Sequence, residues 1–238
     1  DLFGVYSKKV VVSGNVVEVY EYEKDVLYGY SDTKKKTGGR SSVAKKEDKI
    51  INREKVLSRA RRDLRRIINA NIEKHSKFLT LTFKDNITDL DFANNEFKKF
   101  IKRINYHYKV KVKYSVVIEF QKRGAIHYHA LLYNLTDKLD IDKLSSIWGN
   151  GFIKVNSIKD VDNVGAYVCK YMTKTDDERL LGRKMYFNSR NLNKPKEIKE
   201  SSVVEALVGS LQKNSLTYMN TFKNEYNSIN YKQYIIQE

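Results

Sequence analysis

The sequence predicts an α+β fold in which an antiparallel sheet carries helices on one face, with N- and C-terminal extensions. Three observations support this. The chain of 238 residues is 41% hydrophobic, which is enough for a buried core. Runs with a period of two alternate with runs whose apolar residues recur at helical spacing. Between residues 77 and 175 these runs follow the order strand, helix, strand, strand, helix, strand, helix, which is the split-βαβ plan.

A β-rich extension is expected at residues 1–42. Residues 5–30 alternate Val and Tyr with polar residues, which is typical of a β-hairpin. A basic helix is expected next, at 43–76, with apolar side chains on one face and arginines on another. Such a face can hold the phosphate backbone of a nucleic acid without contacting bases, and the alternative is a solvated charged face. The candidates are Arg53, Arg61, Arg62, Arg65 and Arg66.

The core domain is expected at residues 77–200, followed by a C-terminal extension at 201–238. Its strands are expected at 77–83, 113–120, 125–133 and 152–155, and its helices at 91–109, 137–148 and 161–175. A charged loop should occupy 176–200. In the extension, SVVEALVGSL predicts a helix, and the Tyr- and Asn-rich tail from Ser215 can add strands.

Charge and cysteine content narrow the classes of function. The chain has 45 basic and 29 acidic residues, a formal net charge of +16, which would hold a polyanion such as nucleic acid. A basic surface without a partner is the alternative. A lone cysteine, Cys169, fits a reducing, cytoplasmic setting. No apolar run of about 18 residues is present, so no membrane span is expected.

Two histidines share one side of a predicted strand in AIHYHALLYN, residues 125–134. Side chains alternate along a strand, so His127 and His129 point to the same face, about 7 Å apart. Glu119 precedes the QKRG turn and should lie opposite Ile126, within one residue, where it reaches the same rim. Two imidazoles and a carboxylate make a three-ligand metal site with open positions. The alternative is a pair of structural histidines satisfied by hydrogen bonds.

Two tyrosines share one face of the predicted helix in VGAYVCKYMTK, residues 164–174. At 100° per residue, the shared arc of about 100° holds four side chains, Tyr167, Lys170, Tyr171 and Lys174. Gly165 lets the helix start close to another backbone. A tyrosine can attack phosphorus when lysines and a metal favour its phenolate. The alternative is an amphipathic helix with tyrosines at its boundary.

Together these motifs resemble the HUH endonucleases, in particular the rolling-circle replication initiators (Rep) of single-stranded DNA phages and plasmids. FLTLTF resembles their first motif, QKRGAIHYHALL the second, and AYVCKYMTK the third in its two-tyrosine version. MYFNSRNLNKP resembles the segment that follows. The resemblance covers roughly residues 60–200. Histidines precede tyrosines here, as in the Rep branch, whereas in conjugative relaxases the tyrosine comes first.

The resemblance implies a mechanism. The substrate would be a single-stranded DNA origin, and Glu119, His127 and His129 would hold Mg²⁺ or Mn²⁺. One tyrosine would attack, leaving a 5′-phosphotyrosine bond and a free 3′-OH that a host polymerase extends, and the second tyrosine would later pass the strand on. Tyr167 is expected to make the first cut. Lys170 and Lys174 would stabilise negative charge.

The chain carries no GxxxxGK[ST] loop, so a host helicase is the expected motor. Three alternatives use the same residues. An HUH transposase would apply the same chemistry to transposon ends. A metal phosphodiesterase would use water and form no protein–DNA bond. A non-enzymatic single-stranded nucleic-acid-binding protein would have structural histidines.

Overall fold

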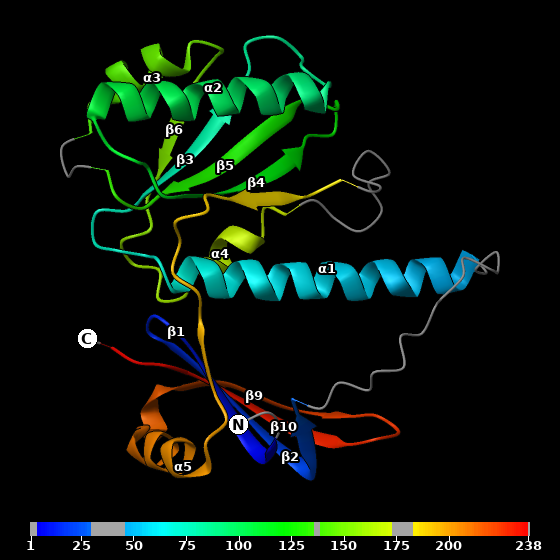
Figure 1. Cartoon of the computed structure of the whole chain (residues 1–238). Coiled ribbons are helices and arrows are strands. Elements are labelled where there is room, and N and C mark those ends of the chain that lie inside the picture. The colour runs from blue at the N-terminus through cyan, green and yellow to red at the C-terminus, as the bar shows by residue number, and fades with distance from the viewer. Residues whose placement is uncertain (1–3, 30–45, 136–138, 173–182, 238) are drawn as a thin grey trace. The chain divides into compact units, whose positions relative to one another are not determined.

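The computed structural model describes residues 4–29, 46–135, 139–172 and 183–237 (Figure 1). The chain divides into two compact units. Residues 57–193 form one unit, and residues 1–56 together with 194–238 form the other. Each unit contains a five-stranded antiparallel sheet, so the predicted α+β class is confirmed.

The sheet of the 57–193 unit has the strand order β6-β3-β5-β4-β7. Every neighbouring pair in it is antiparallel. The element order predicted from the sequence is confirmed, because β3, α2, β4, β5, α3, β6 and α4 follow one another along the chain. The strands, in spatial order, are β6 (Ile153–Asn156), β3 (Lys77–Thr82), β5 (Ile126–Leu132), β4 (Tyr114–Phe120) and β7 (Tyr186–Asn188).

Helices α2 (Leu90–Tyr108) and α3 (Ile141–Trp148) pack on one face of this sheet (Figure 1). Asp89 starts α2 by accepting hydrogen bonds from the first-turn amides, as expected of an N-cap. The largest hydrophobic core forms between these helices and the sheet. It is rich in aromatic side chains, including the buried Phe97, Phe100, Tyr128 and Trp148.

The opposite face is covered by α4 (Val164–Cys169) and by part of α1 (Lys46–Asn69) (Figure 1). Leu64 of α1 and Val168 of α4 are buried there against Leu131 of β5. The sequence predicted helices on one face, and the structure adds this second helical layer. The physical reason is that the central strands bury apolar side chains on both faces, as strands covered on both sides do.

The connection between β4 and β5 fixes the register of the two strands. The Gln121 amide donates to the carbonyl of Ala125 at 2.9 Å, and Gly124 has a φ of 87°, which favours glycine. The loop therefore includes Ala125, one residue more than the predicted QKRG turn. As a result Glu119 lies opposite His127 rather than Ile126. The one-residue shift brings the carboxylate to the histidine side of the strand.

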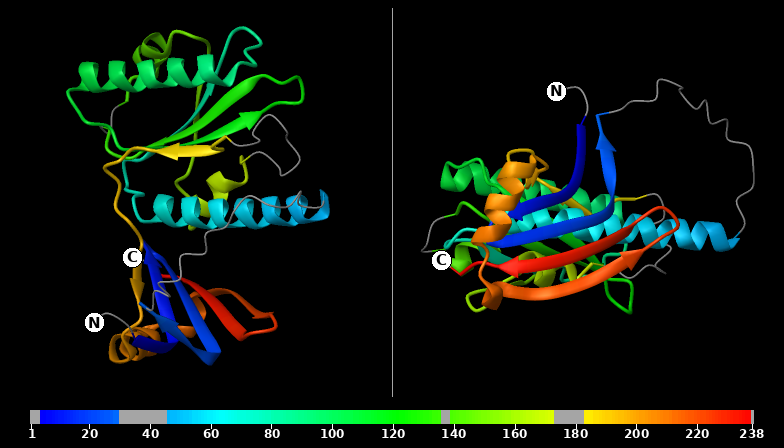
Figure 2. Two further views of the ribbon diagram at one scale, coloured as in Figure 1. Left: turned by 45° about the vertical axis from the view of Figure 1, so that its right-hand side comes forward. Right: turned by 90° about the horizontal axis from the view of Figure 1, so that it is seen from below.

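The second unit joins the two extensions that the sequence analysis treated separately. Helix α5 (Ser201–Ser210) packs on one face of their common sheet, over Val10, Val17 and Val19 (Figure 2). Each strand of this sheet is antiparallel to its neighbours. In spatial order the strands are β8 (Lys196–Ile198), β1 (Gly4–Ser13), β2 (Val16–Tyr28), β10 (Ser228–Ile235) and β9 (Leu216–Lys223).

Two predicted segments differ from the structure. The expected loop at 176–200 contains the short strands β7 and β8, which have too few residues to show a recognisable alternation. The helix expected at 161–175 is regular only over α4 and ends at Cys169. Residues 173–182, including Lys174, lie outside the described residues. In the part of the chain that the structure describes, no helix combines the length and apolar character needed to cross a bilayer.

Candidate functional site

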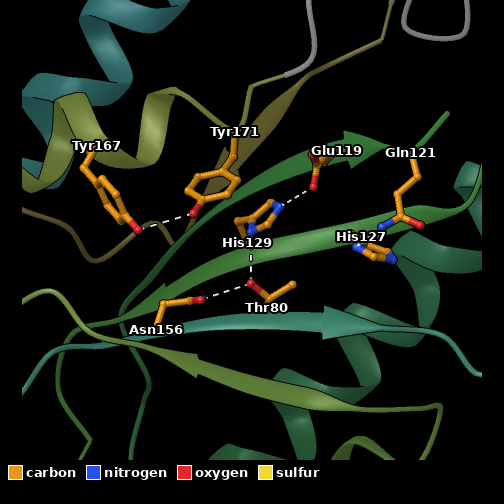
Figure 3. Close-up of polar contacts among 8 residues, drawn as sticks. All are labelled: Thr80, Glu119, Gln121, His127, His129, Asn156, Tyr167 and Tyr171. Atoms are coloured by element: carbon orange, nitrogen blue, oxygen red, sulfur yellow. Dashed lines mark hydrogen bonds and ion pairs between the residues drawn. The ribbon is translucent and has the colours of Figure 1, made fainter.

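Strands β3, β4 and β5 place a set of polar side chains on the sheet face that α4 covers (Figure 3). His127 and His129 both point to this face because they are two residues apart on β5. Thr80 of β3 pairs with His129, and Glu119 of β4 pairs with His127. The predicted common face of the two imidazoles and the carboxylate is present in the structure.

His129 is buried and held from both ring nitrogens. Its Nε2 lies 2.6 Å from Oε2 of Glu119, and its Nδ1 lies 3.1 Å from Oγ1 of Thr80. The side-chain amide of Asn156 on β6 donates to Thr80 Oγ1 at 2.9 Å. A hydroxyl both donates and accepts, so Thr80 can bond to Nδ1 in either tautomer of the ring. The imidazole is therefore fixed in orientation while its Nε2 can exchange partners.

Glu119 remains accessible although it touches a buried residue. Its side chain is 37% exposed, against 4% for that of His129. The hydrogen bond from His129 holds the pKa of the Glu119 carboxyl below its usual value, more than burial raises it. The carboxylate is thus ionised at neutral pH and open to a cationic ligand.

His127 turns away from the other two side chains toward the loop (Figure 3). The Gln121 side-chain amide donates to Nδ1 of His127 at 3.1 Å. Burial lowers the pKa of His127, and the charge of Glu119 opposes this only in part. The imidazole is neutral at physiological pH, which is the form that binds metal ions.

Helix α4 is anchored at its first turn by a pair of asparagines. Asn163 caps it by accepting from the amide of Ala166 at 2.9 Å. Asn69 of α1 accepts from the amide of Gly165 at 2.8 Å and donates to the Asn163 side chain at 2.9 Å. A Cβ on Gly165 would overlap the carbonyl oxygen of Arg65, which confirms the close backbone approach predicted there.

The two tyrosines lie together, as the helical spacing predicted, and Tyr171 lies beside His129. The Tyr171 ring stacks on the imidazole, with centroids 4.1 Å apart and an interplanar angle of 30°. The hydroxyls of Tyr167 and Tyr171 are 3.3 Å apart, and both rings pack edge-on against Phe78. Beyond Cys169 the backbone continues with i→i+3 hydrogen bonds, which keep Tyr171 on this side.

Of the two tyrosines, Tyr171 is the one that contacts His129, and its phenol holds its proton tightly. The hydrogen bond with Tyr167, burial and the charge of Glu119 raise the pKa of Tyr171 to about 12. The Lys170 ammonium lies 5.8 Å from the centre of the Tyr167 ring. The other predicted lysine, Lys174, is outside the described residues, so only Lys170 is placed beside the pair.

Glu119, His127 and His129 have side chains of the kinds that bind metal ions, although each of them forms a hydrogen bond to another side chain in this structure. Within residues 4–29, 46–135, 139–172 and 183–237, no three His, Cys, Asp or Glu side chains converge as a ready-made ligand cluster. Glu119 bonds to His129, while His127 bonds to Gln121. Two imidazole nitrogens and an accessible carboxylate nevertheless have the right chemistry, and they lie at paired positions of one sheet face. The residues fit a divalent ion once His127 exchanges Gln121 for it.

The predicted DNA-binding arginines occupy different environments along α1. Arg62 is exposed and pairs with Asp63 at 2.9 Å. Arg61 and Arg65 lie on the side of α4, because the Cys169 thiol donates to the Arg61 carbonyl at 3.4 Å and Gly165 approaches Arg65. Arg66 is half-buried in the last turn. Arg53 is half-buried and belongs to the other compact unit.

Sequence reasoning did not find three polar residues of the site. Thr80 had a signal, since the alternation in FLTLTF puts it on the same face as Phe78, between that residue and Thr82. Gln121 was assigned only to the turn. Asn156 had no signal, because its contact with Thr80 depends on the pairing of β6 with β3.

An antiparallel sheet with paired histidines, a carboxylate and two adjacent tyrosines defines a site with the groups needed for metal-assisted phosphoester chemistry. Residues 76–176, which contain this site, match the sequence model of a family described as Replication-associated protein ORF2. The match covers less than half of the chain and indicates a role related to replication. Comparison with curated proteins and with solved structures gave no match.

Proposed function

We propose that this chain initiates rolling-circle replication by nicking and rejoining a single-stranded DNA origin through a 5′-phosphotyrosine intermediate. One observation carries the proposal: the Tyr171 ring is stacked on His129, which in turn bonds to Glu119. The proposed nucleophile would thus lie against the residues with metal-binding chemistry. The match of residues 76–176 to a replication-associated family supports the same conclusion.

Glu119, His127 and His129 would hold a divalent ion, Mg²⁺ or Mn²⁺. Such an ion would supply positive charge that polarises a phosphate oxygen and favours a nearby phenolate. Around it, the chain's own residues orient the ligands. His127 would give up its hydrogen bond to Gln121 to face the ion. Thr80 would keep the His129 ring in place through its hydrogen bond to Nδ1 at 3.1 Å. Outer contacts of this kind keep ligand geometry fixed in metal sites generally.

In the first step the Tyr171 oxygen would form a bond to phosphorus, and the bond from phosphorus to the 3′-oxygen would break. The phenol loses its proton and the leaving 3′-oxygen gains one, so the step is balanced without an oxidant or an added cofactor. Tyr167, whose hydroxyl is 3.3 Å from that of Tyr171, would attack in the second transfer. This order reverses the one expected from sequence, because Tyr171 is the ring that contacts His129.

The remaining assignments follow from charge. Lys170 beside Tyr167 would stabilise the phenolate, and Lys174 would act in the same way. Arg62 and the other arginines of α1 would contact the DNA backbone without selecting sequence. The partners would be the single-stranded origin, a host polymerase that extends the 3′-OH, and a host helicase.

The test is a covalent adduct between the protein and labelled single-stranded DNA in the presence of Mn²⁺. The adduct should survive denaturing gel electrophoresis, and peptide mapping should find DNA on the peptide that contains Tyr167 and Tyr171. Tyr171→Phe should lose most of the first-cut adduct, Tyr167→Phe should keep it, and the double mutant should form none. Phe keeps the ring and its packing, so a loss would be chemical.

Other outcomes separate the competing functions. Cleavage without an adduct would indicate a phosphodiesterase that uses water. DNA binding that survives a chelator, with no cleavage under any condition, would indicate a non-enzymatic binding protein with structural histidines. Adduct formation by the double mutant, or on a tyrosine elsewhere in the chain, would refute the assigned nucleophiles.

A further inference from the structure

A basic hollow lies between α2 and α3, on the sheet face opposite the tyrosines and histidines. Its volume is about 360 Å³, and it is lined by Lys102, Arg103, Tyr106, His107, Lys143 and Ile147. Both helices pack on the face that holds the largest core, whereas the candidate catalytic residues point to the other face. The hollow is therefore a separate surface.

The lining combines positive charge with an aromatic ring. Three of the six lining residues are lysine or arginine, and none is acidic. The Tyr106 side chain is 78% exposed, and the Lys109 ammonium lies 4.3 Å from the centre of its ring. Arg103 is oriented by donating to the carbonyl of Ile147 at 3.3 Å. The hollow is shallow and open to solvent, and its cationic side chains lie around the exposed ring.

The helical spacing of α2 produces this arrangement. Position 106 lies four residues after 102 and three after 103, so its side chain shares a face with both. The opposite side of the helix carries the buried Phe97, Phe100 and Ile104. The buried side of α2 thus fixes the helix on the core, and its polar side faces solvent beside α3.

We infer that the α2–α3 hollow binds one nucleotide unit of a DNA strand, with its phosphate on Lys102, Arg103 and Lys143 and its base on Tyr106. Complementarity of charge identifies the polyanion, and the exposed ring beside the cations favours a nucleic acid with unpaired bases. The choice of DNA rests on the proposed function. A strand that reaches both faces passes around the sheet, so this surface would hold DNA outside the segment being cut.

The test compares the salt dependence of binding in matched variants. Fluorescence anisotropy would measure the affinity of the full chain for a labelled single-stranded oligonucleotide of random sequence at 50 and 200 mM salt. The variant Lys102→Gln with Arg103→Gln removes two cations from the hollow. The control, Lys213→Gln with Lys223→Gln, removes two exposed cations from the other compact unit.

Each phosphate contact on a single strand contributes about −0.7 to the log–log salt slope. Losing two contacts should therefore reduce the ratio of Kd at 200 mM to Kd at 50 mM by about 7-fold. The control variant should keep the wild-type ratio. Tyr106→Ala should weaken binding about 5-fold or more at both salt concentrations without changing the slope, because it removes stacking and no charge.

A wild-type slope in the Lys102 and Arg103 variant would overturn the inference, and so would an equal change in the control. Adduct formation with a short oligonucleotide, of about 10 nucleotides, should be unchanged in the hollow variants. If the wild type forms no adduct but the hollow variant still loses salt dependence, the proposed function fails and this inference stands. If adducts form normally and the slopes are identical, this inference alone fails.

Discussion

Adding one methyl group at Gly165 should destabilise the 57–193 unit and displace the tyrosines. The Cβ of Gly165→Ala would overlap the Arg65 carbonyl oxygen and lie 2.8 Å from Oδ1 of Asn69. A backbone oxygen inside α1 cannot swing aside as a flexible side chain can. Gly165 has no positive φ, so the conflict is one of space and not of backbone conformation.

The expected cost combines two terms of opposite sign. Inserting a methyl group into a packed contact costs about 1–3 kcal/mol. Replacing glycine by alanine recovers about 0.4–1 kcal/mol from the unfolded chain. The net loss should be about 1–2 kcal/mol, or roughly 2–8 °C in Tm for a domain of this size. Circular dichroism would follow unfolding, and a DNA adduct assay would follow the position of Tyr171.

Gly209→Ala is the matched control. Gly209 lies in helix α5, and a Cβ there would meet nothing within 4 Å. The same chemical change should therefore leave Tm unchanged or raise it slightly. The reasoning fails if Gly165→Ala melts at the wild-type temperature, or if it loses stability only as much as Gly209→Ala does.

Three further predictions concern the candidate site. Divalent ions at about 100 times their Kd should stabilise the wild type by about 2.7 kcal/mol in thermal unfolding. The variants His127→Ala and His129→Ala should show no such gain. An equal gain in all three proteins would refute the assignment of these histidines as metal ligands. Thr80→Val leaves His129 Nδ1 and Asn156 without their hydroxyl partner, so divalent-ion affinity measured by calorimetry should fall about 10- to 100-fold; unchanged affinity would argue against a positioning role. Burial raises the pKa of the Cys169 thiol to about 11 from 9.0, so its thiolate should be about 100-fold rarer at pH 8 than in the unfolded chain and its alkylation correspondingly slow. Fast alkylation of Cys169 at pH 8 would contradict its burial. Because the folded state binds the thiol proton more tightly than the unfolded state does, the contribution of this thiol to the free energy of unfolding should decline between about pH 9 and 11.

The sequence alone was enough to predict features that depend on local periodicity. Alternation on a strand put His127 and His129 on one face, and helical spacing put Tyr167 beside Tyr171. Both arrangements are present. The element order of the 57–193 unit followed from the same two periods.

Features that depend on contacts between distant segments could not be predicted in this way. Asn69 and Asn163 meet only because α1 and α4 pack together, and no local pattern marks either residue as a cap partner. Glu119 lies opposite His127, one residue from the expected Ile126, because Ala125 belongs to the loop and does not pair with β4. Strand β7 has only three residues, and it is a strand because it pairs with the edge of β4.

The terminal sheet has a consequence for how the chain is made. Strand β2 ends at residue 28 and its partner β10 begins at residue 228, so 200 residues separate the two edges that pair. At a synthesis rate of about 5–20 residues per second, the first hairpin leaves the ribosome roughly 10–40 s before its partner exists. During that interval β2 has an unpaired edge, and the exposed Glu23, Lys24 and Asp25 near its end place charge where another chain could add a strand. The 57–193 unit is synthesised before residues 194–238, so the candidate catalytic face can form before the terminal sheet has all its strands.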